Sequence, residues 1–276
     1  MSVLTQMLAR YPQQTSDDIH HAWREVLQEV ALVGLARGGF FQQAAFYGGT
    51  CLRLFHGLPR FSEDLDFSLL AAKPGFSFQP YFNALQDEFA ALGVPVDISE
   101  KVKTAETAIA SAFLKPNTTV YDVRVAGKRS LKIKFEVDTD PPLGFATEDM
   151  LLLQPAACYV RCFSLPDLFA GKMHALLFRQ WKNRVKGRDW FDFEWYVRQG
   201  VPLHLKHLEA RMRQSGDWDE RDLTPIEFNA LLKEKIAMLN MDSARADVLR
   251  FVPDANALAI WSTHYFQQLS QRIVLL

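Results

Sequence analysis

The chain has 276 residues, of which 49% are hydrophobic and 23% charged, and its formal net charge is −1. This suffices for a sizeable core in one or two domains and excludes a protein coated in basic residues, while leaving room for a local basic groove. The three cysteines, Cys51, Cys158 and Cys162, indicate reduced thiols rather than a disulfide framework. No apolar run reaches membrane-spanning length and no signal-peptide pattern opens the chain, so we expect a cytoplasmic protein without a membrane partner.

The N-terminal part of the chain predicts a long amphipathic helix. It begins near residue 16, with Ser16 or Asp17 as its cap, and ends before Gly38 and Gly39. Its apolar residues recur at helical spacing and form one stripe: Ile19, Trp23, Val26, Leu27, Val30 and Val33. We therefore expect this helix to pack against the core and to take no part in chemistry.

A short strand, a glycine pair and a second strand come next. Residues 44–47 predict a strand, Gly48 and Gly49 a tight turn, residues 50–55 a helical turn, and residues 65–70 the second strand. Glycine lets backbone N–H groups approach phosphate oxygens closely, and the helix that follows would direct its positive end to the same place. The turn is therefore a candidate phosphate cradle.

Two aspartates occupy alternate positions around the start of the second strand. Because alternate side chains share one face of a strand, Asp64 and Asp66 should point the same way while Leu65 and Phe67 point into the core. Two carboxylates held in this way can bind Mg²⁺. A solvated acidic loop would not interleave its acids with core residues. Together with the glycine turn, the pair predicts a nucleoside triphosphate site.

The middle of the chain predicts one helix and three strands. Residues 81–92 have helical periodicity, and residues 94–103, 120–125 and 131–137 have strand character. Residues 126–129 should join the last two strands as a hairpin. The sheet is therefore expected to be mixed or antiparallel.

From Pro166 onward the periodicity is helical almost to the end. It is interrupted at four places: Gly187, Gly200–Pro202, Ser215–Gly216 and Pro253. The pairs of histidines in the chain, such as His204 and His207, are predicted to lie at the surface. We expect an α+β fold, with a mixed or antiparallel sheet and flanking helices in residues 1–160, followed by a helical domain in residues 161–276 that completes the active site.

A charged face is predicted on the strand at residues 131–137. Alternation puts Lys132, Lys134, Glu136 and Asp138 on one face and apolar residues on the other. Alone, this pattern predicts a solvent-facing side with paired charges. Metal-dependent nucleases place the lysine two residues after the acid, the reverse of the order here, which argues against a nuclease.

Basic residues gather in and after the helix that begins near Pro166. Lys172 lies among apolar residues, where its ammonium must reach solvent or find an anion. Five further cations follow within ten residues, close to two tryptophans: Arg179, Lys182, Arg184, Lys186 and Arg188. They predict either a solvated loop or a groove for nucleic-acid phosphates, with indoles available for base stacking.

Three of these stretches together resemble a known family. The Gly48–Gly49–Thr50 turn, the Arg60–Phe67 segment and the segment from Asp167 to Asp192 look like motifs of the AbiEii/AbiGii nucleotidyltransferase toxins, within the DNA polymerase β-like superfamily. The similarity runs from about residue 46 to residue 196. The tail beyond residue 200 carries none of the motifs.

The resemblance implies a Mg²⁺-dependent nucleotidyltransferase, with Mn²⁺ as an alternative metal, and assigns roles to individual residues. The third carboxylate beside Asp64 and Asp66 would be Glu136, although Asp138 has the same facing. The implied catalytic residues are Asp64, Asp66, Glu136, Lys172 and Asp189. The implied nucleotide-binding residues are Gly48, Gly49, Thr50, Arg53, Ser62, Lys172 and Arg188. The implied RNA-binding residues are Arg179, Lys182, Arg184 and Lys186. If Lys172 binds the triphosphate, its replacement by methionine should change stability little.

The resemblance also implies a biological setting. The family comprises toxins of toxin–antitoxin or abortive-infection systems in phage defence, so we expect an NTP substrate, a cognate antitoxin and an RNA acceptor such as a tRNA 3′ end. The alternatives are a transferase or kinase acting on a small-molecule or protein hydroxyl, a nucleotide-binding regulator without turnover, and an interaction module that uses the helical half. The sequence leaves the NTP, the acceptor and the oligomeric state open.

Overall fold

The structure is a computed structural model that describes residues 2–100, 118–125, 131–179, 185–219 and 221–276. The chain forms two compact units, which are described separately below. The first unit consists of Met1–Gly57, Phe61–Pro141 and Thr147–Cys162. The second unit consists of Leu58–Arg60, Pro142–Ala146 and Phe163–Leu276.

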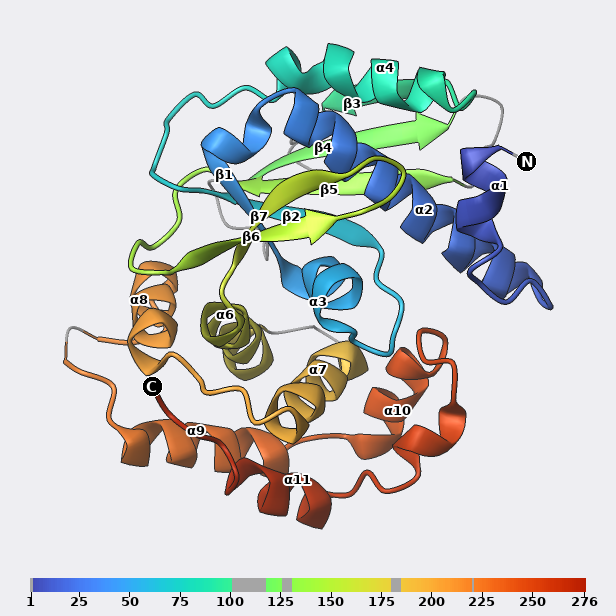
Figure 1. Cartoon of the computed structure of the whole chain (residues 1–276). Helices are drawn as coiled ribbons and strands as arrows, with labels where there is room; N and C mark the ends of the chain where they lie inside the picture. Colours follow the sequence, from blue (N-terminus) through green and yellow to red (C-terminus); the bar gives the residue numbers. More distant parts are fainter. Residues whose placement is uncertain (1, 101–117, 126–130, 180–184, 220) are drawn as a thin grey trace. The chain divides into compact units, whose positions relative to one another are not determined.

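In the described part of the first unit, seven strands form a mixed sheet in the order β3-β4-β5-β2-β1-β7-β6 (Figure 1). Its strands are β1 (Ala44–Tyr47), β2 (Asp64–Leu69), β3 (Val96–Glu100), β4 (Thr118–Val125), β5 (Lys132–Asp138), β6 (Thr147–Leu152) and β7 (Cys158–Phe163). β2 pairs antiparallel with β1 but parallel with β5, and β1 pairs parallel with β7. The prediction of an α+β fold with a mixed sheet is confirmed.

Among the described residues, the first unit has four α-helices: α1 (Val3–Leu8), α2 (Ser16–Arg37), α3 (Gly48–His56) and α4 (Phe82–Ala91). The predicted cap of α2 was wrong by one or two residues. Thr15 is the N-cap, and its side chain accepts from the backbone of Asp18 while the Asp18 carboxylate accepts from the backbone of Thr15. This reciprocal capping box satisfies two N–H groups that the first turn of a helix leaves without partners.

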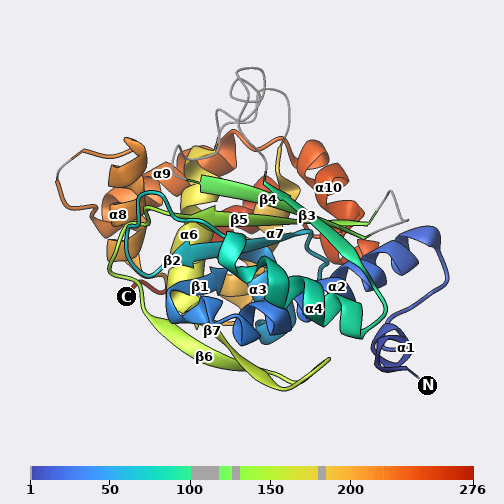
Figure 2. The same cartoon turned by 90° about the horizontal axis from the view of Figure 1, so that it is seen from above.

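One face of the sheet carries the aromatic core of the first unit. Phe67 of β2 and Phe135 of β5 are completely buried, and their rings contact Phe40 and Phe78. α2 and α4 pack against each other, and α2 also contacts β5 (Figure 2). Burial of these rings fixes which side of β2 and β5 faces inward, so the alternate residues of both strands must face the other side.

Two strands of the sheet, β6 and β7, were not predicted from the sequence. Residues 147–152 are mostly exposed because β6 is an edge strand. Their sequence therefore lacks the alternation of apolar and polar residues that marks a half-buried strand. The predicted β4–β5 pairing is confirmed by its antiparallel register, whereas the hairpin connection at residues 126–129 lies outside the described residues.

The second unit is helical, as expected. Its α-helices are α6 (Leu165–Phe178), α7 (Gly187–Arg198), α8 (Leu205–Ser215), α9 (Pro225–Ala237), α10 (Met241–Leu249) and α11 (Thr263–Ser270). Aromatic rings join them: Phe169 stacks on Tyr196 at 4.4 Å, and Phe266 lies 5.1 Å from Trp190. Gly187 is the first residue of α7, and a Cβ atom there would lie 1.8 Å from the backbone oxygen of Ala244, so this close approach requires glycine.

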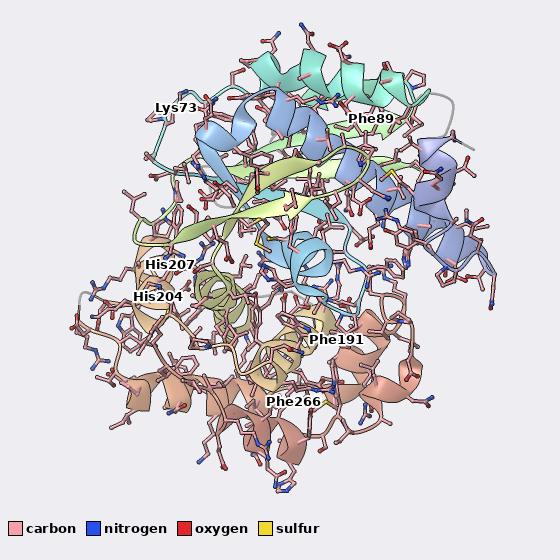
Figure 3. The ribbon with its side chains drawn as sticks, viewed as in Figure 1. Lys73, Phe89, Phe191, His204, His207 and Phe266 are labelled. Carbon is pink, nitrogen blue, oxygen red and sulfur yellow. The ribbon has the colours of Figure 1, made fainter. Side chains whose placement is uncertain are left out.

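His204, the N-cap residue of α8, and His207 within α8 differ in their surroundings (Figure 3). His207 was predicted at the surface, but it is only 1% exposed, and its ring lies 5.8 and 6.2 Å from those of Phe145 and Phe163, which stack on each other. The half-buried His204 contacts the buried carboxylate of Asp167 at 2.6 Å. That carboxylate also accepts from Ser164 and Ala146, so it holds together the start of α6 and two neighbouring segments.

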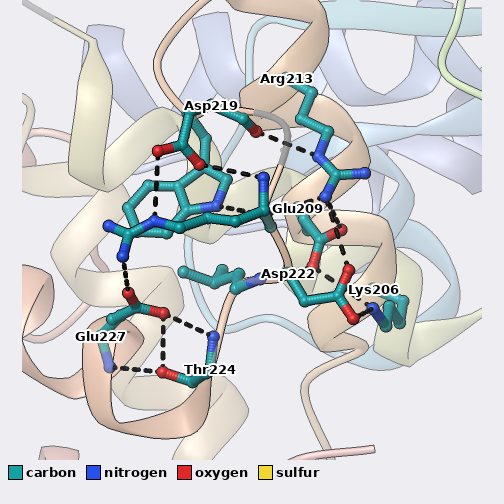
Figure 4. A network of polar contacts seen from close by, with 10 residues as sticks. Lys206, Glu209, Arg213, Asp219, Asp222, Thr224 and Glu227 are labelled. Carbon is teal, nitrogen blue, oxygen red and sulfur yellow. Dashed lines mark hydrogen bonds and ion pairs between the residues drawn. The ribbon is translucent and has the colours of Figure 1, made fainter.

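Charged side chains fasten the connection between α8 and α9 (Figure 4). Arg213 of α8 forms ion pairs with Glu209 and Asp222, and Lys206 binds the same two carboxylates. Thr224 and Glu227 form the capping box of α9.

Over the described ranges, no helix is both long enough and apolar enough to cross a bilayer.

Candidate functional site

Gly48 brings the backbone at the start of α3 against a carboxylate of β2. Its φ is +84°, a conformation that favours glycine, and a Cβ atom placed on it would lie 2.4 Å from Asp66 Oδ2. The glycine is therefore required both by the backbone and by the space that the Asp66 carboxylate occupies. Gly49 follows as the second residue of α3 and is half-buried.

Hydrogen bonds from two helices fix the start of β2 and the residues just before it. The buried hydroxyl of Thr50 donates to the backbone oxygen of Asp64 at 2.5 Å, which ties α3 to β2. The amide of Gln28 in α2 donates to the backbone oxygens of Ser62 and Glu63. These bonds engage the Thr50 hydroxyl and the Ser62 carbonyl within the protein, so both residues fix the position of the acid pair.

Three carboxylates and one ammonium lie on the same face of neighbouring strands. In the parallel register of β2 and β5, Asp64 is opposite Lys134 and Asp66 is opposite Glu136. All four side chains are half-buried, whereas Leu65 and Phe135, which are paired between them, are completely buried. The predicted orientation of the aspartates is thus the one observed.

The register also separates the two candidates for the third carboxylate. Glu136 is opposite Asp66, while Asp138 is opposite Ser68 and is only 3% exposed. A ligand of a metal that also meets substrate must be accessible, so the geometry favours Glu136. Its assignment as a metal ligand stays a prediction.

The Glu136 carboxylate is engaged by an ion pair within its own strand. Lys134 Nζ donates to Glu136 Oε1, and both side chains remain partly exposed. Among the residues that the structure describes, no three His, Cys, Asp or Glu side chains converge closely enough to hold a metal. The donor chemistry nevertheless fits a hard divalent cation, because the three carboxylates share one face of adjacent strands.

Arg53 was assigned to the nucleotide, and in the structure it contacts residues of the first unit. Its Nε lies 2.9 Å from a carboxylate oxygen of the buried Glu25, and its guanidinium lies 4.6 Å from the ring centre of Phe61. The charge of Arg53 is thus partly compensated by α2. Its role toward a triphosphate stays a prediction.

A second group of charges is buried in the second unit. Lys172 Nζ lies 2.8 Å from oxygens of both Asp189 and Asp192, and Arg60 binds Asp192 through two hydrogen bonds of 2.6 and 2.5 Å. Asp192 is 0% exposed. These contacts lead to the opposite prediction for the stability of Lys172→Met, because removal of the lysine would leave buried carboxylates with less compensation.

The charges around Asp189 also shift the pKa values of Asp189 and of the neighbouring Lys186. Burial alone would raise the pKa of the Asp189 carboxyl, but the charges of Lys172, Lys186 and Arg179 hold it well below its usual range. Burial, together with the charges of Arg179 and Arg188, lowers the pKa of Lys186 to about 8. A lysine with this pKa is charged near neutral pH and loses its charge as the pH rises above about 8.

Two of the four predicted RNA-binding residues, Arg179 and Lys186, are among the described residues. Arg179 is exposed at the end of α6, and Lys186 is half-buried just before α7. Lys182 and Arg184 lie outside the described residues. Arg188, assigned to the nucleotide, has its guanidinium 4.1 Å from the ring centre of Phe251.

Two residues of these groups received no role from the sequence. Arg60 is part of a motif, but its partner Asp192 is 132 residues away, so no local pattern could join them. Lys134 did carry a signal, since it precedes Glu136 by two residues and must share its face. What the sequence could not give is its position opposite Asp64.

A family model for the nucleotidyl transferase AbiEii toxin of type IV toxin–antitoxin systems matches residues 30–272. The matched segment includes both charge groups described above. No curated protein matches the sequence significantly.

Two solved structures have a similar fold. MenT4, a nucleotidyltransferase toxin from Mycobacterium tuberculosis H37Rv, is 14% identical, with a TM-score of 0.60 over 98% of this chain and 88% of MenT4. JHP933 from Helicobacter pylori is 18% identical, with a TM-score of 0.51 over 91% of this chain and 90% of JHP933. At these identities the likeness concerns the fold alone.

Replacement of Gly48 by alanine should destabilise the first unit and displace Asp66. The new methyl group meets the Asp66 carboxylate and the backbone is strained, so we expect a loss of about 2 kcal/mol or more in the free energy of unfolding. Gly57→Ala is the matched control, because Gly57 also has a positive φ but has open space around it, and should cost only about 1 kcal/mol. Equal losses in chemical denaturation would contradict the close packing of Gly48 on Asp66.

Replacement of Lys172 by methionine should destabilise the second unit strongly. It leaves Asp189 and Asp192 buried with less compensating charge, so we expect a loss of about 3–5 kcal/mol. Lys206→Met is the control, because that lysine also pairs with two carboxylates but is exposed, and its melting temperature should stay near that of the parent. Similar melting temperatures for both variants would show that the Lys172 ion pairs contribute little.

Proposed function

The chain belongs to the AbiEii family of nucleotidyl transferase toxins of type IV toxin–antitoxin systems, and from this premise we propose that it transfers a nucleoside monophosphate from an NTP to a hydroxyl group of RNA, such as a tRNA 3′ end. The family makes the chain a nucleotidyltransferase and implies an NTP substrate and an antitoxin partner. The identity of the acceptor is the part that we add.

The observation that carries the nucleotidyl-transfer part of the proposal is the arrangement of Gly48, Asp66 and Glu136. Gly48 lies against the Asp66 carboxylate, and Asp66 is opposite Glu136 in the sheet. A glycine turn at a helix N-terminus offers backbone N–H groups to phosphate oxygens, and here it does so beside carboxylates. A structural turn would not need both the glycine and the acids at one place.

Nucleotidyltransferases generally use a divalent metal, and Asp64, Asp66 and Glu136 would hold Mg²⁺ or Mn²⁺ in this chain. When bound, the cation supplies positive charge that offsets the charge of the triphosphate. The carboxylates are suited to this role because they are partly exposed and share one face of the sheet.

The residues of the first unit would orient the reactants and move one proton. Gly48, Gly49 and Thr50 lie where backbone N–H groups at the start of α3 can bind phosphate oxygens. The acceptor oxygen forms a bond to the α-phosphorus while the bond from that phosphorus to the leaving pyrophosphate oxygen breaks. The proton of the acceptor hydroxyl passes to a carboxylate, for which we propose Glu136.

The roles proposed in the second unit rest on the family motifs and on charge. Asp189 holds the ammonium of Lys172, and we propose that this pair serves the triphosphate. Arg179 and Lys186 supply positive charge next to α6 and α7, which supports an RNA acceptor because RNA carries one negative charge per nucleotide.

Asp66→Asn should abolish transfer while leaving the fold intact. The amide removes a charged ligand and at the same time relieves repulsion between neighbouring carboxylates, so the melting temperature should be unchanged or slightly higher. The measurement is the labelling of cellular RNA in Mg²⁺ buffer with each α-³²P NTP in turn. Asp97→Asn, at an exposed aspartate of β3, is the control and should label RNA like the parent.

The label also separates the alternatives. Transfer of the γ-phosphate instead of the α-phosphate would identify a kinase. Label in a small molecule or protein, but not in RNA, would refute the RNA acceptor while leaving the nucleotidyltransferase intact. Undiminished labelling by Asp66→Asn would show that the reaction does not use this carboxylate group.

RNA affinity should decrease as the pH rises from 7 to 9. The pKa of Lys186 is lowered to about 8, so the residue is charged below that pH and loses its positive charge above it. Lys186→Arg keeps its charge over the whole range and should flatten the dependence. The measurement is fluorescence anisotropy with labelled tRNA at constant ionic strength. The same pH dependence in both proteins would exclude Lys186 from RNA binding.

A further inference from the structure

Lys134 lies within the carboxylate group of the first unit. It is opposite Asp64 in the register of β2 and β5, and its ammonium donates to Glu136, which is itself opposite Asp66. The lysine therefore shares one face of the sheet with the three carboxylates proposed to hold a metal. Lys132, on the same face and strand, turns to Asp122 of β4 instead, at 2.9 Å.

The ammonium of Lys134 occupies a place among the carboxylates. It donates to Glu136, and Lys134 is opposite Asp64 and next to the Asp66–Glu136 pair in the register of the strands. The carboxylates therefore act on this ammonium in the way that they would act on a bound cation. A fixed positive charge at that position opposes the approach of a second cation.

On the basis of the proposed function, we propose that Lys134 is a built-in counter-cation of the carboxylate group. Without nucleotide, its ammonium holds Glu136 and competes with a divalent cation for the carboxylates. A divalent cation then binds tightly only together with an NTP.

A bound nucleotide would weaken the competition between Lys134 and the metal ion through the charge of its phosphates. Its phosphates add negative charge beside the carboxylates and give Lys134 another anionic partner, so Glu136 becomes available as a ligand. Metal and NTP then raise each other's affinity by the same factor, because such coupling is reciprocal. Lys134 thus acts as a positioning residue that makes the metal site depend on substrate.

The test is the affinity for Mn²⁺ alone, measured by calorimetry and by the concentration dependence of thermal unfolding. Lys134→Met should bind Mn²⁺ at least about tenfold more tightly than the parent, because one positive charge next to the site is removed. Non-hydrolysable α,β-methylene analogues of the four NTPs, tested in turn, should raise Mn²⁺ affinity in the parent by a larger factor than in Lys134→Met.

Two matched variants separate charge from packing. Lys134→Arg keeps the positive charge and should bind Mn²⁺ as weakly as the parent. Lys132→Met removes a lysine of the same strand and face whose partner is Asp122, and it should also bind like the parent. Tighter Mn²⁺ binding by either variant would refute a specific role for the Lys134 charge.

The outcomes distinguish this inference from the proposed function. If Asp66→Asn abolishes Mn²⁺ binding while Lys134→Met binds Mn²⁺ like the parent or more weakly, the carboxylates hold the metal and the counter-cation proposal is wrong. If Asp66→Asn and Lys134→Met both bind Mn²⁺ like the parent, the metal site lies elsewhere and both proposals are wrong. Tighter binding by Lys134→Met alone supports the proposal.

Discussion

The parallel pairing of β2 with β5 is the constraint on which the candidate site depends. These strands are far apart in sequence, and only their register brings Asp66 opposite Glu136 and Asp64 opposite Lys134. The register is fixed from the opposite face, since a shift by one residue would expose Phe67 and Phe135 and bury the charges. Burial of aromatic rings thus determines where the acids lie.

In both units, the charged groups proposed to act on substrate are already compensated by charges of the protein. Lys134 holds Glu136 in the first unit, and Asp189 holds Lys172 in the second. Such pairs offset the cost of burying ionised side chains. Without a partner, burial would shift the pKa of each group so that its uncharged form is favoured. A substrate or metal must therefore compete with an internal partner, which ties binding to the charge that the ligand brings.

The glycines of this chain illustrate how a general preference becomes a specific requirement. Many of them have positive φ values with open space around them, and there only the backbone conformation matters. Gly48 differs because the space that a side chain would need is occupied by the Asp66 carboxylate, and Gly187 differs because the backbone of Ala244 lies against it. In both cases a missing side chain permits a tertiary contact.

The sequence by itself determined the local elements and the facing of the acids, because strand alternation and helical periodicity are short-range properties. Strand β1 at residues 44–47 and the inward-facing Leu65 and Phe67 follow directly from these patterns. It could not show β6, an edge strand without alternation, or the burial of His207. Only the tertiary structure decided that Glu136 rather than Asp138 is opposite Asp66, and that Arg60 binds Asp192. Strand register and long-range ion pairs depend on how distant segments pack, which no local pattern records.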